Sequence, residues 1–524
     1  MKEKLYNGIE LTDEWPPKNT SHDSNEPMPV PYLDSAPENI PIDVGRQLFV
    51  DDFLVETTDM QRVFHQPDKH PGNPMVSPEK DYEASSVYLV GEPALWDPQN
   101  SVFKMWYSPG HWVAPRALLL SEDGIHWRRP ELDVKPRTNI VMPAYERFAI
   151  CSVLRDDQEN DNARRFKAYG WESQRDQGHV NVFLSSPDGI HWHEEGRWPD
   201  TFSQDTTNIF FNPFRNQWVY NPKISGKGRS RGYAEVNSFK ELMDGNMVGN
   251  RLVKWLRSDY MDDRSDELEE TPIAQIYDLF AVPYESIMLG AINVWYGPEN
   301  PRCHEQRMPK LLQIQMGYSR DGFHWHRPVR KPFIPAVRQA GPGHPEYGYL
   351  RPAGSVLNVV DDTLYFYYMA ASGVDKQGRP GVYTGITINL ATLRRDGFAS
   401  MRAGAEEATL LTRPVIFSGK YLFVNVDNPD GVLAVEACSE EGAPLPGFSK
   451  TDCLPVSANR TQTMIRWNGN RTLAEHAGRA IRFSFSMTRG DLYAFWVSGS
   501  ERGESRGYLG GGGPGFKRYQ DGVI

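Results

Sequence analysis

Five segments of the chain repeat one pattern of apolar and polar positions. Each has a short run of β-branched or aromatic residues, a polar turn, and a second run that ends in aromatic residues. This pattern is typical of a β-hairpin. The segments are ALWDPQNSVFKMWYS (94–108), SVLRDDQENDNARRFKAYGW (152–171), IFFNPFRNQWVYNPK (209–223), LFAVPYESIMLGAINVWYG (279–297) and SVLNVVDDTLYFYYMAASG (355–373).

A second motif recurs between these hairpins and predicts how the chain is organised. Ser-x-Asp-Gly-(Ile/Phe)-His-Trp begins at Ser121, Ser186 and Ser319, at intervals of 65 and 133 residues. The second interval is about twice the first, so a degenerate copy of the motif is expected between them, near 251–260. A fifth copy, which keeps only part of the motif, surrounds Asp396. A motif that recurs along the fold serves its architecture. We therefore interpret His126, His191 and His324 as turn residues, because Asp accepts backbone hydrogen bonds there and Gly supplies a positive φ.

The repeats and the hairpins together predict the fold class. Each unit contains one of the five aromatic hairpins and a second hairpin closed by the Asp-Gly turn, which together give about four strands. Five such units arranged radially form a five-bladed β-propeller. The composition agrees, because 14 Trp, 24 Tyr, 24 Phe, 45 Gly and 40 Pro are typical of an all-β chain. From about residue 404 the repeat is lost and short alternating strands predict a C-terminal β-sandwich.

These patterns divide the 524 residues into four parts. Residues 1–45 are rich in Pro and acidic residues and predict an irregular arm, and 46–403 form the catalytic propeller. Within the propeller, 45–56 are expected to form a strand that leads toward the first blade. Residues 404–498 form the sandwich, and the Gly-rich 499–524 are expected to be a flexible tail.

Charge and cysteine content exclude several functions. The 57 Lys and Arg residues against 68 Asp and Glu residues give a net charge of −11, and basic blocks are absent, so neither nucleic acid nor a membrane surface is an expected partner. The four cysteines show neither a disulfide framework nor metal-ligand spacing, so no metal and no cofactor are expected. The start of the chain lacks the apolar segment of a signal peptide, which favours a cytoplasmic location. Formation of a homo-oligomer stays open.

Candidate chemistry emerges when the hairpins are aligned on their turns. Glu92 in the first unit and Asp278 in the fourth each lie five residues before a turn residue, and Asp205 in the third lies two residues further out, on the same strand face. Arg351 lies slightly upstream in the fifth unit, and Asp51 and Asp52 lie on the entering strand. Because the first strands of propeller blades surround the axis, these side chains are expected to converge there.

Converging carboxylates suit the cleavage of a glycosidic bond. One carboxylic acid protonates the leaving oxygen, and a second carboxylate attacks the anomeric carbon or activates water. A third carboxylate could raise the pKa of the acid and hold sugar hydroxyls. The catalytic candidates are Asp52, Glu92, Asp205 and Asp278, and the candidates for contacts with the sugar are Asp51, His65, Trp106, Trp112, Glu285 and Arg351.

Propeller blades, inner-strand carboxylates, Ser-x-Asp-Gly-x-x-Trp turns and a trailing sandwich together resemble the five-bladed propeller glycosidases. These comprise the invertase and levanase family 32 and the arabinan- and xylan-acting family 43. The strings LFVDDFLVE (48–56) and TLLTRPVIFSGKYLFVNV (409–426) resemble a divergent family 32-like subgroup. The resemblance implies a nucleophile or base at Asp52 or Glu92, and an acid and a pKa-tuning carboxylate at Asp278 and Asp205. The invertase motif Trp-Met-Asn-Asp-Pro-Asn-Gly is absent, so fructose specificity is not implied.

The sequence therefore predicts an exo-acting glycoside hydrolase for a furanoside or small oligosaccharide. Two alternatives stay open. A glycoside phosphorylase on the same fold would need one acid and a basic cluster for phosphate, to which Arg351 and the run 326–331 could contribute. A non-catalytic carbohydrate-binding propeller would keep the fold without the chemistry. A sialidase is disfavoured, because only Arg351 is suitably placed among the three arginines that such a site needs.

Overall fold

The computed structural model describes residues 2–18, 24–142, 148–174, 178–199, 206–226, 228–262 and 274–522. Within this part, strands dominate and the helices are short, so the all-β prediction is confirmed. The α-helices are α1 (Pro31–Asp34), α2 (Phe239–Leu242), α3 (Gly245–Arg251) and α4 (Asn300–Gln306). The 3-10 turns are η1 (Asp81–Glu83), η2 (Asn162–Arg164), η3 (Arg338–Ala340), η4 (Asn468–Asn470) and η5 (Leu473–His476).

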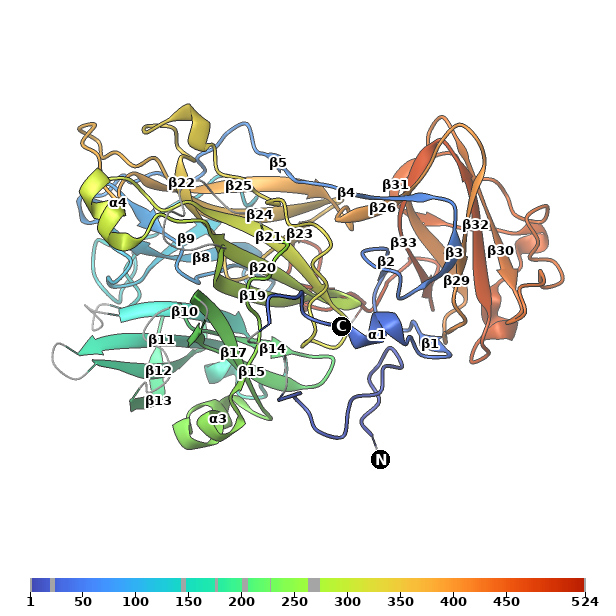
Figure 1. Cartoon of the computed structure of the whole chain (residues 1–524), viewed down its shortest axis with the longest axis horizontal. Helices are drawn as coiled ribbons and strands as arrows, with labels where there is room; N and C mark the ends of the chain where they lie inside the picture. The colour runs from blue at the N-terminus through green and yellow to red at the C-terminus, as the bar shows by residue number, and fades with distance from the viewer. Residues whose placement is uncertain are drawn as a thin grey trace.

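The predicted hairpins form successive antiparallel sheets on one side of the molecule (Figure 1). The first sheet contains β6 (Val87–Tyr88), β7 (Ala94–Asp97), β8 (Val102–Pro109) and β9 (Ala117–Ser121), and the second contains β10 (Phe148–Arg155), β11 (Phe166–Gln174), β12 (Gly178–Ser186) and β13 (His193–Pro199). The third contains β14 (Asn208–Asn212), β15 (Gln217–Asn221), β16 (Lys223–Gly226), β17 (Gly228–Val236) and β18 (Val253–Lys254). The fourth contains β19 (Gln275–Glu285), β20 (Ile287–Trp295), β21 (Leu312–Ser319) and β34 (Tyr508–Leu509), and the fifth contains β22 (Gly348–Pro352), β23 (Asn358–Val360), β24 (Thr363–Ala371), β25 (Ile386–Arg394) and β5 (Asp68–Lys69).

Polar contacts join these sheets in a closed cycle around one axis. Each sheet contacts the next through or near its first strand, and the fifth sheet returns to the first. The linking hydrogen bonds run from Ile209 N to Ser152 Oγ (2.9 Å), Asn208 Nδ2 to Leu279 O (3.0 Å), Asn293 Nδ2 to Leu350 O (2.8 Å) and Arg351 Nη2 to Val90 O (2.6 Å). Between the first two sheets, Gly91 approaches so closely that a Cβ would lie 2.1 Å from Cys151 O. A closed cycle of sheets is the arrangement of a β-propeller.

The Asp-Gly repeats stabilise turns, as the sequence indicates. In the first copy, Ser121 Oγ accepts from Gly124 N (2.9 Å) and Asp123 Oδ1 accepts from His126 N (2.8 Å). The Asp123 carboxylate also contacts His126 Nδ1 at 2.7 Å, and Gly124 has φ +76°. The copies at Ser186 and Ser319 repeat this geometry. The three histidines therefore belong to the turns.

Two further sheets face each other beyond the propeller (Figure 1). A cluster of buried residues, including Leu410, Val424 and Phe495, forms their core. One sheet has the order β31 (Asn459–Met464), β29 (Tyr421–Asp427), β33 (Gly490–Ser498), β26 (Ala399–Ala403) and β4 (Gln61–Phe64), with β2 (Gln47–Leu48) also on β33. The other has the order β3 (Val55–Thr58), β27 (Ala408–Thr412), β32 (Arg482–Thr488) and β30 (Val432–Cys438), and β1 (Ile40–Pro41) pairs in parallel with β28 (Val415–Ile416).

Strands from early in the chain complete these two sheets. Residues 45–56 are predicted from the sequence to form a strand that leads toward the first propeller blade, but β2 pairs with β33 and β3 pairs with β27. The strand β26, which precedes the expected boundary at 404, pairs with β33 and β4. These pairings satisfy backbone groups that would otherwise lie at open sheet edges.

The C-terminal segment 505–522 packs across the propeller, although the sequence predicted a flexible tail. β34 pairs with β19 of the fourth sheet. Gly511 N donates to Leu357 O of the fifth sheet (2.8 Å), and Trp96 N of the first sheet donates to Gly511 O (2.9 Å). A Cβ on Gly513 would lie 1.5 Å from Val359 O. The glycines that suggested flexibility instead permit close contact between two backbones.

Candidate active site

Glu92 lies just before β7 with its carboxylate held by a buried arginine. Its side chain is fully buried, and Oε1 lies 2.8 Å from Arg116 Nε and 3.0 Å from Ser108 Oγ. Oε2 accepts from Val90 N and from Gly91 N, the latter at 3.0 Å. Burial lowers the pKa of Arg116, although Glu92 opposes this shift. The carboxylate is thus fixed by three hydrogen-bond donors and by the ion pair with Arg116.

Asp278, on the first strand of the fourth sheet, lies between two buried arginines. Its Oδ2 is 2.5 Å from Arg351 Nη2, and its Oδ1 is 3.7 Å from Arg231 Nη1. The exposed fractions of Asp278 and Arg351 are 1% and 3%. Burial alone would lower the pKa of Arg351, but the adjacent Asp278 carboxylate raises it above its ordinary value. Arg351 also donates to Val90 O, two residues before Glu92.

Cys151 lies on β10, where its carbonyl oxygen closely approaches Gly91, the residue before Glu92. Burial raises the pKa of the Cys151 thiol, and the negative charges of Asp278 and Glu92 raise it further, whereas Arg351 and Arg116 act in the opposite sense. The cysteine is therefore within electrostatic reach of both carboxylates. Glu92, Asp278 and Arg351 are linked through Val90, because Arg351 Nη2 donates to Asp278 Oδ2 and Val90 O, and Val90 N donates to Glu92 Oε2.

A group of cations and aromatic rings adjoins Asp278. The guanidinium of Arg351 lies 5.6 Å from the centre of the Tyr277 ring, and Lys310 Nζ lies 5.3 Å from the same ring. Arg229 stacks 4.3 Å over Trp295 and lies 5.6 Å from Tyr277. Rings that pack against cations in this way gain electrostatic stabilisation. This end of the axis thus combines carboxylates, arginines and aromatic surfaces.

The two tryptophans that we expected to contact the sugar have different environments in the structure. Trp106 is fully buried, and its Nε1 donates to Gly189 O in the second sheet at 2.8 Å. It therefore packs between sheets and presents no surface for a ligand. Trp112 is half-buried, stacks edge-on with Trp171 at 5.7 Å, and its carbonyl accepts from Arg116 Nη2 at 3.3 Å. Trp112 is thus adjacent to the ion pair of Glu92.

Asp51, Asp52 and His65 do not join the axis. Asp51 is buried and accepts from Arg320 Nη2 at 2.7 Å and Nε at 2.8 Å. The side chain of Asp52 is 70% exposed and pairs with Arg62 at 2.5 Å, while His65 Nε2 contacts Ser400 Oγ at 2.9 Å. Their segment belongs to the two C-terminal sheets, which explains the displacement. Asp205 lies outside the described residues.

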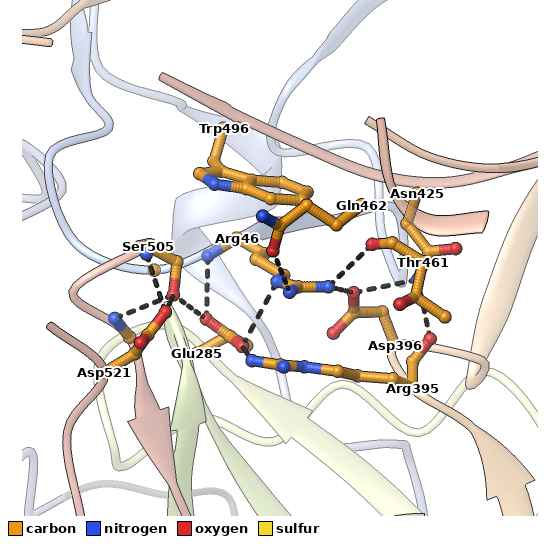
Figure 2. A network of polar contacts seen from close by, with 12 residues as sticks. Arg46, Glu285, Arg395, Asp396, Asn425, Thr461, Gln462, Trp496, Ser505 and Asp521 are labelled. Atoms are coloured by element: carbon orange, nitrogen blue, oxygen red, sulfur yellow. Dashed lines mark hydrogen bonds and ion pairs between the residues drawn. The ribbon is translucent and has the colours of Figure 1, made fainter. Parts of the chain in front are cut away.

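Glu285 lies at the opposite end of β19 from Asp278, in a buried polar network (Figure 2). Its carboxylate accepts from Arg46 N (3.0 Å), Arg395 Nη2 (3.0 Å) and Ser505 Oγ (2.7 Å). Arg46 also pairs with Asp396 at 2.9 Å. The network joins the fourth sheet to the C-terminal sheets and to the C-terminal segment. Glu285 therefore holds these segments together and does not lie where a contact with the sugar was expected.

Sequence reasoning missed Arg116 and Arg231. Both are fully buried, and they lie at or within the third strands of their hairpin units rather than the first strands used for the alignment. The available signal was an arginine beside or within an otherwise apolar strand, as in APRALLL (114–120). Such a charge requires a buried partner. Adding them gives three arginines near two carboxylates among the described residues.

The described residues contain no group of three or more His, Cys, Asp or Glu side chains arranged to hold a metal ion. Over the same part of the chain, no helix combines the length and the apolar character needed to span a bilayer. All four cysteines are buried and free of disulfide bonds.

Comparison with known proteins gives matches to solved structures alone. No model of a protein family matches the sequence. No curated protein matches it either.

Several solved structures have a similar arrangement at low identity. An N-acetylgalactosamine deacetylase from F. plautii, in complex with blood group B trisaccharide, is 15% identical with a TM-score of 0.44, over 63% of this chain and 96% of that one. A thermostable family-43 glycoside hydrolase is 12% identical (TM-score 0.40; 60% and 92% covered). A family 32 β-fructofuranosidase from Bombyx mori is 11% identical (TM-score 0.35; 83% and 94% covered). The matched structures thus include both glycosidase families named from the sequence.

Proposed function

We propose that this protein is a glycoside hydrolase whose reaction takes place at the Glu92 end of the propeller axis. The observation that carries the proposal is the link between Glu92 and Asp278, which come from two different sheets. Arg351 Nη2 donates to both Asp278 Oδ2 and Val90 O, and Val90 N donates to Glu92 Oε2. Glycoside hydrolysis uses a pair of carboxyl groups on either side of the scissile bond. Both carboxylates are buried, and exclusion of water strengthens their electrostatic interactions.

The roles follow from the surroundings of each group. Glu92, held by Arg116, Ser108 and two backbone amides, is the proposed nucleophile or base. Asp278, between Arg351 and Arg231, is the proposed partner that stabilises positive charge on the sugar ring and orients its hydroxyls. Asp205, which the resemblance pairs with Asp278 as the acid and the pKa-tuning carboxylate, is the proposed general acid. Trp112, next to Arg116, is the proposed stacking surface for the sugar.

The proposed substrate is the end of a furanoside or small oligosaccharide. A site at the axis of a propeller is surrounded by loops from every blade, and such a funnel favours chain ends over internal bonds. The direct experiment is a screen of aryl furanosides, aryl pyranosides and sugar oligomers without phosphate. Hydrolysis that is lost in Glu92→Gln and Asp278→Asn, with both variants folded at the assay temperature, would support the assignment. Full activity in both variants would contradict it.

A glycoside phosphorylase is the second candidate, and one observation favours it. Arg116, Arg231 and Arg351 outnumber the two carboxylates they contact in the described part of the site. Guanidinium groups bind phosphate through paired hydrogen bonds. Turnover that requires inorganic phosphate and releases a sugar phosphate would select this reaction. Binding of sugars with no turnover under either condition would identify a carbohydrate-binding protein.

A further inference from the structure

The C-terminal segment 505–522 is attached to the end of β19 through one serine hydroxyl (Figure 2). Ser505 Oγ lies 2.7 Å from Glu285 Oε2 and 3.1 Å from Asp521 Oδ2. Ser505 N also donates to Asp521 Oδ2 at 2.8 Å, and Gly507 N donates to Ser505 Oγ at 3.1 Å. The hydroxyl therefore lies between a carboxyl group of the propeller and a carboxyl group of the segment itself.

The two contacts of this hydroxyl with carboxyl groups need two protons, and the hydroxyl supplies one. A serine hydroxyl donates one hydrogen bond and accepts two, and an ionised carboxylate only accepts. When Glu285 and Asp521 are both ionised, one of them therefore faces a lone pair of Ser505 Oγ. When the two share one proton, one carboxyl group donates to Ser505 Oγ, which in turn donates to the other. Both contacts are then hydrogen bonds.

Two arginines face three carboxyl groups at this junction (Figure 2). Arg395 Nη2 lies 3.0 Å and Arg46 Nε lies 3.5 Å from Glu285 Oε1, and Arg46 Nη1 lies 2.9 Å from Asp396 Oδ2. The hydrogen bonds to Asp521 Oδ2, in contrast, come from uncharged groups. A negative charge on Asp521 therefore disfavours a negative charge on the nearby Glu285.

The carboxyl groups at the junction differ in how their surroundings affect ionisation. Burial raises the pKa of Glu285, and the charges of Asp396 and Asp521 raise it further, although Arg395 and Arg46 act in the opposite sense. Burial alone would also raise the pKa of Asp396, but the two arginines hold it below its ordinary value. Asp396 therefore keeps its charge, and a proton at this junction belongs to the pair formed by Glu285 and Asp521.

The other charged and titratable groups near the junction have their own partners or are exposed. The Tyr284 hydroxyl donates to Asp396 Oδ1 at 2.7 Å, and burial raises its pKa. Glu504 lies 2.8 Å from Arg502, and Arg506 is exposed. The two carboxyl groups that flank the serine hydroxyl are therefore the place where one proton changes the contacts of the segment.

The segment packs so tightly on Glu285 that repulsion between the two carboxylates strains its attachment. A Cβ on Gly507 would lie 1.9 Å from Glu285 Oε2, and Asp521 N donates to Gly507 O at 2.8 Å. Beyond the junction, Tyr508 and Tyr519 of the segment line a cavity of about 190 Å³ between the propeller sheets. Movement of the segment away from β19 would relieve the repulsion and open the wall of this cavity.

We propose that the C-terminal segment is a proton-dependent latch: one proton shared by Glu285 and Asp521 holds it over the cavity at acidic pH, and loss of that proton loosens it. The proton comes from solvent and returns to solvent. Because the attached segment binds one proton more than the detached segment, attachment weakens as the pH rises above the ordinary carboxyl pKa of about 4. This inference does not depend on the proposed glycosidase activity.

Hydrogen exchange of the full chain, followed by mass spectrometry, tests the latch. Protection factors of peptides from 505–522, corrected for the intrinsic effect of pH on exchange, should be at least about tenfold lower at pH 8 than at pH 5. Tenfold corresponds to one pKa unit between the attached and the detached pair. Protection of peptides from β24 shows in the same experiment that the propeller is folded.

Asp521→Asn is the decisive variant, because it should strengthen attachment at pH 8. The amide oxygen still accepts from Ser505 N, and Ser505 Oγ then donates to Glu285 alone. The segment of this variant should be protected at pH 8 about as well as the wild-type segment at pH 5. Asp430→Asn, which changes an exposed aspartate in the C-terminal sheets, should keep the wild-type pH dependence.

Two results would overturn the proposal. One is wild-type protection of 505–522 that is equal at the two pH values or higher at pH 8. The other is a folded Asp521→Asn variant whose segment keeps the wild-type pH dependence or loses protection at both pH values.

Discussion

The Asp278 carboxylate lies 2.5 Å from the Arg351 guanidinium, and both side chains are almost entirely buried. Removing one member of a buried ion pair leaves an uncompensated charge, which costs about 3–5 kcal/mol. We therefore expect Arg351→Met to lower the free energy of unfolding by about that amount, measured by urea denaturation. The double variant Arg351→Met/Asp278→Asn should be less destabilised than the sum of the single variants. If the changes in unfolding free energy of the two single variants add up to that of the double variant, the two groups are not coupled.

The close approach of Gly91 to Cys151 predicts a severe effect of a single methyl group. A Cβ at position 91 would lie 2.1 Å from Cys151 O, a backbone atom that cannot rotate away. Gly91→Ala should therefore reduce the melting temperature or the yield of folded protein strongly. Gly404→Ala is the matched control, because a Cβ there meets no atom within 4 Å. Similar melting curves for both variants would argue against this contact.

The C-terminal segment is expected to stabilise the propeller. It exchanges hydrogen bonds with Trp96 of the first sheet, Asp157 next to the second, and Leu357 and Val359 at the fifth, in addition to the β34 pairing with the fourth. At about 1 kcal/mol for each hydrogen bond, a chain that ends at residue 504 should lose several kcal/mol of stability. A chain that ends at residue 522 serves as the control. Identical denaturation midpoints for the two truncated chains would show that the segment contributes nothing.

The buried pair Asp97–Lys104 predicts a pH dependence of stability. Burial alone would raise the pKa of Asp97, but Lys104 Nζ, 2.6 Å away, holds it below its ordinary value. A carboxyl group with a lowered folded-state pKa contributes stability above its unfolded pKa of about 3.9, and this contribution disappears as the pH falls through the folded-state value. The destabilisation of Asp97→Asn relative to wild type should therefore be large at pH 7 and shrink below about pH 4.

Urea denaturation between pH 7 and pH 3 measures this difference. Glu407→Gln is the control, because Glu407 pairs with Lys450 on the surface, where such pairs contribute about 0–1 kcal/mol. A difference between Asp97→Asn and wild type that stays constant over the whole range would contradict the account.

The hairpins and the Asp-Gly turns could be predicted because their signals are local. A pair of neighbouring strands can be recognised from its period-two alternation and its turn residues. The residues of the Ser121 motif form the hydrogen bonds of the turn among themselves. The alignment of hairpins on their turns also singled out Glu92, Asp278 and Arg351, which the structure links through Val90.

The remaining features depend on contacts between distant segments. Asp52 precedes the first blade in sequence, yet the strands on either side of it pair with strands after residue 404. Its distance from the axis could therefore not be predicted from the residues next to it in the sequence. The glycines at 510–513 have the composition of a linker, and their packing depends on backbone atoms of Leu357 and Val359. Arg116 and Arg231 were missed because their role depends on buried partners, Glu92 and Asp278, that lie 24 and 47 residues away in the sequence.

The most direct test of the central claim is the kcat/KM of Glu92→Gln on the best aryl glycoside from the screen. The account predicts a fall of at least about a thousandfold, because the proposed nucleophile or base would be lost while Arg116 and Ser108 keep a polar partner. The variant should be folded at the assay temperature, although loss of the ion pair with Arg116 lowers its melting temperature. A folded Glu92→Gln variant that keeps more than about a tenth of wild-type kcat/KM would contradict the assignment of Glu92 to the reaction.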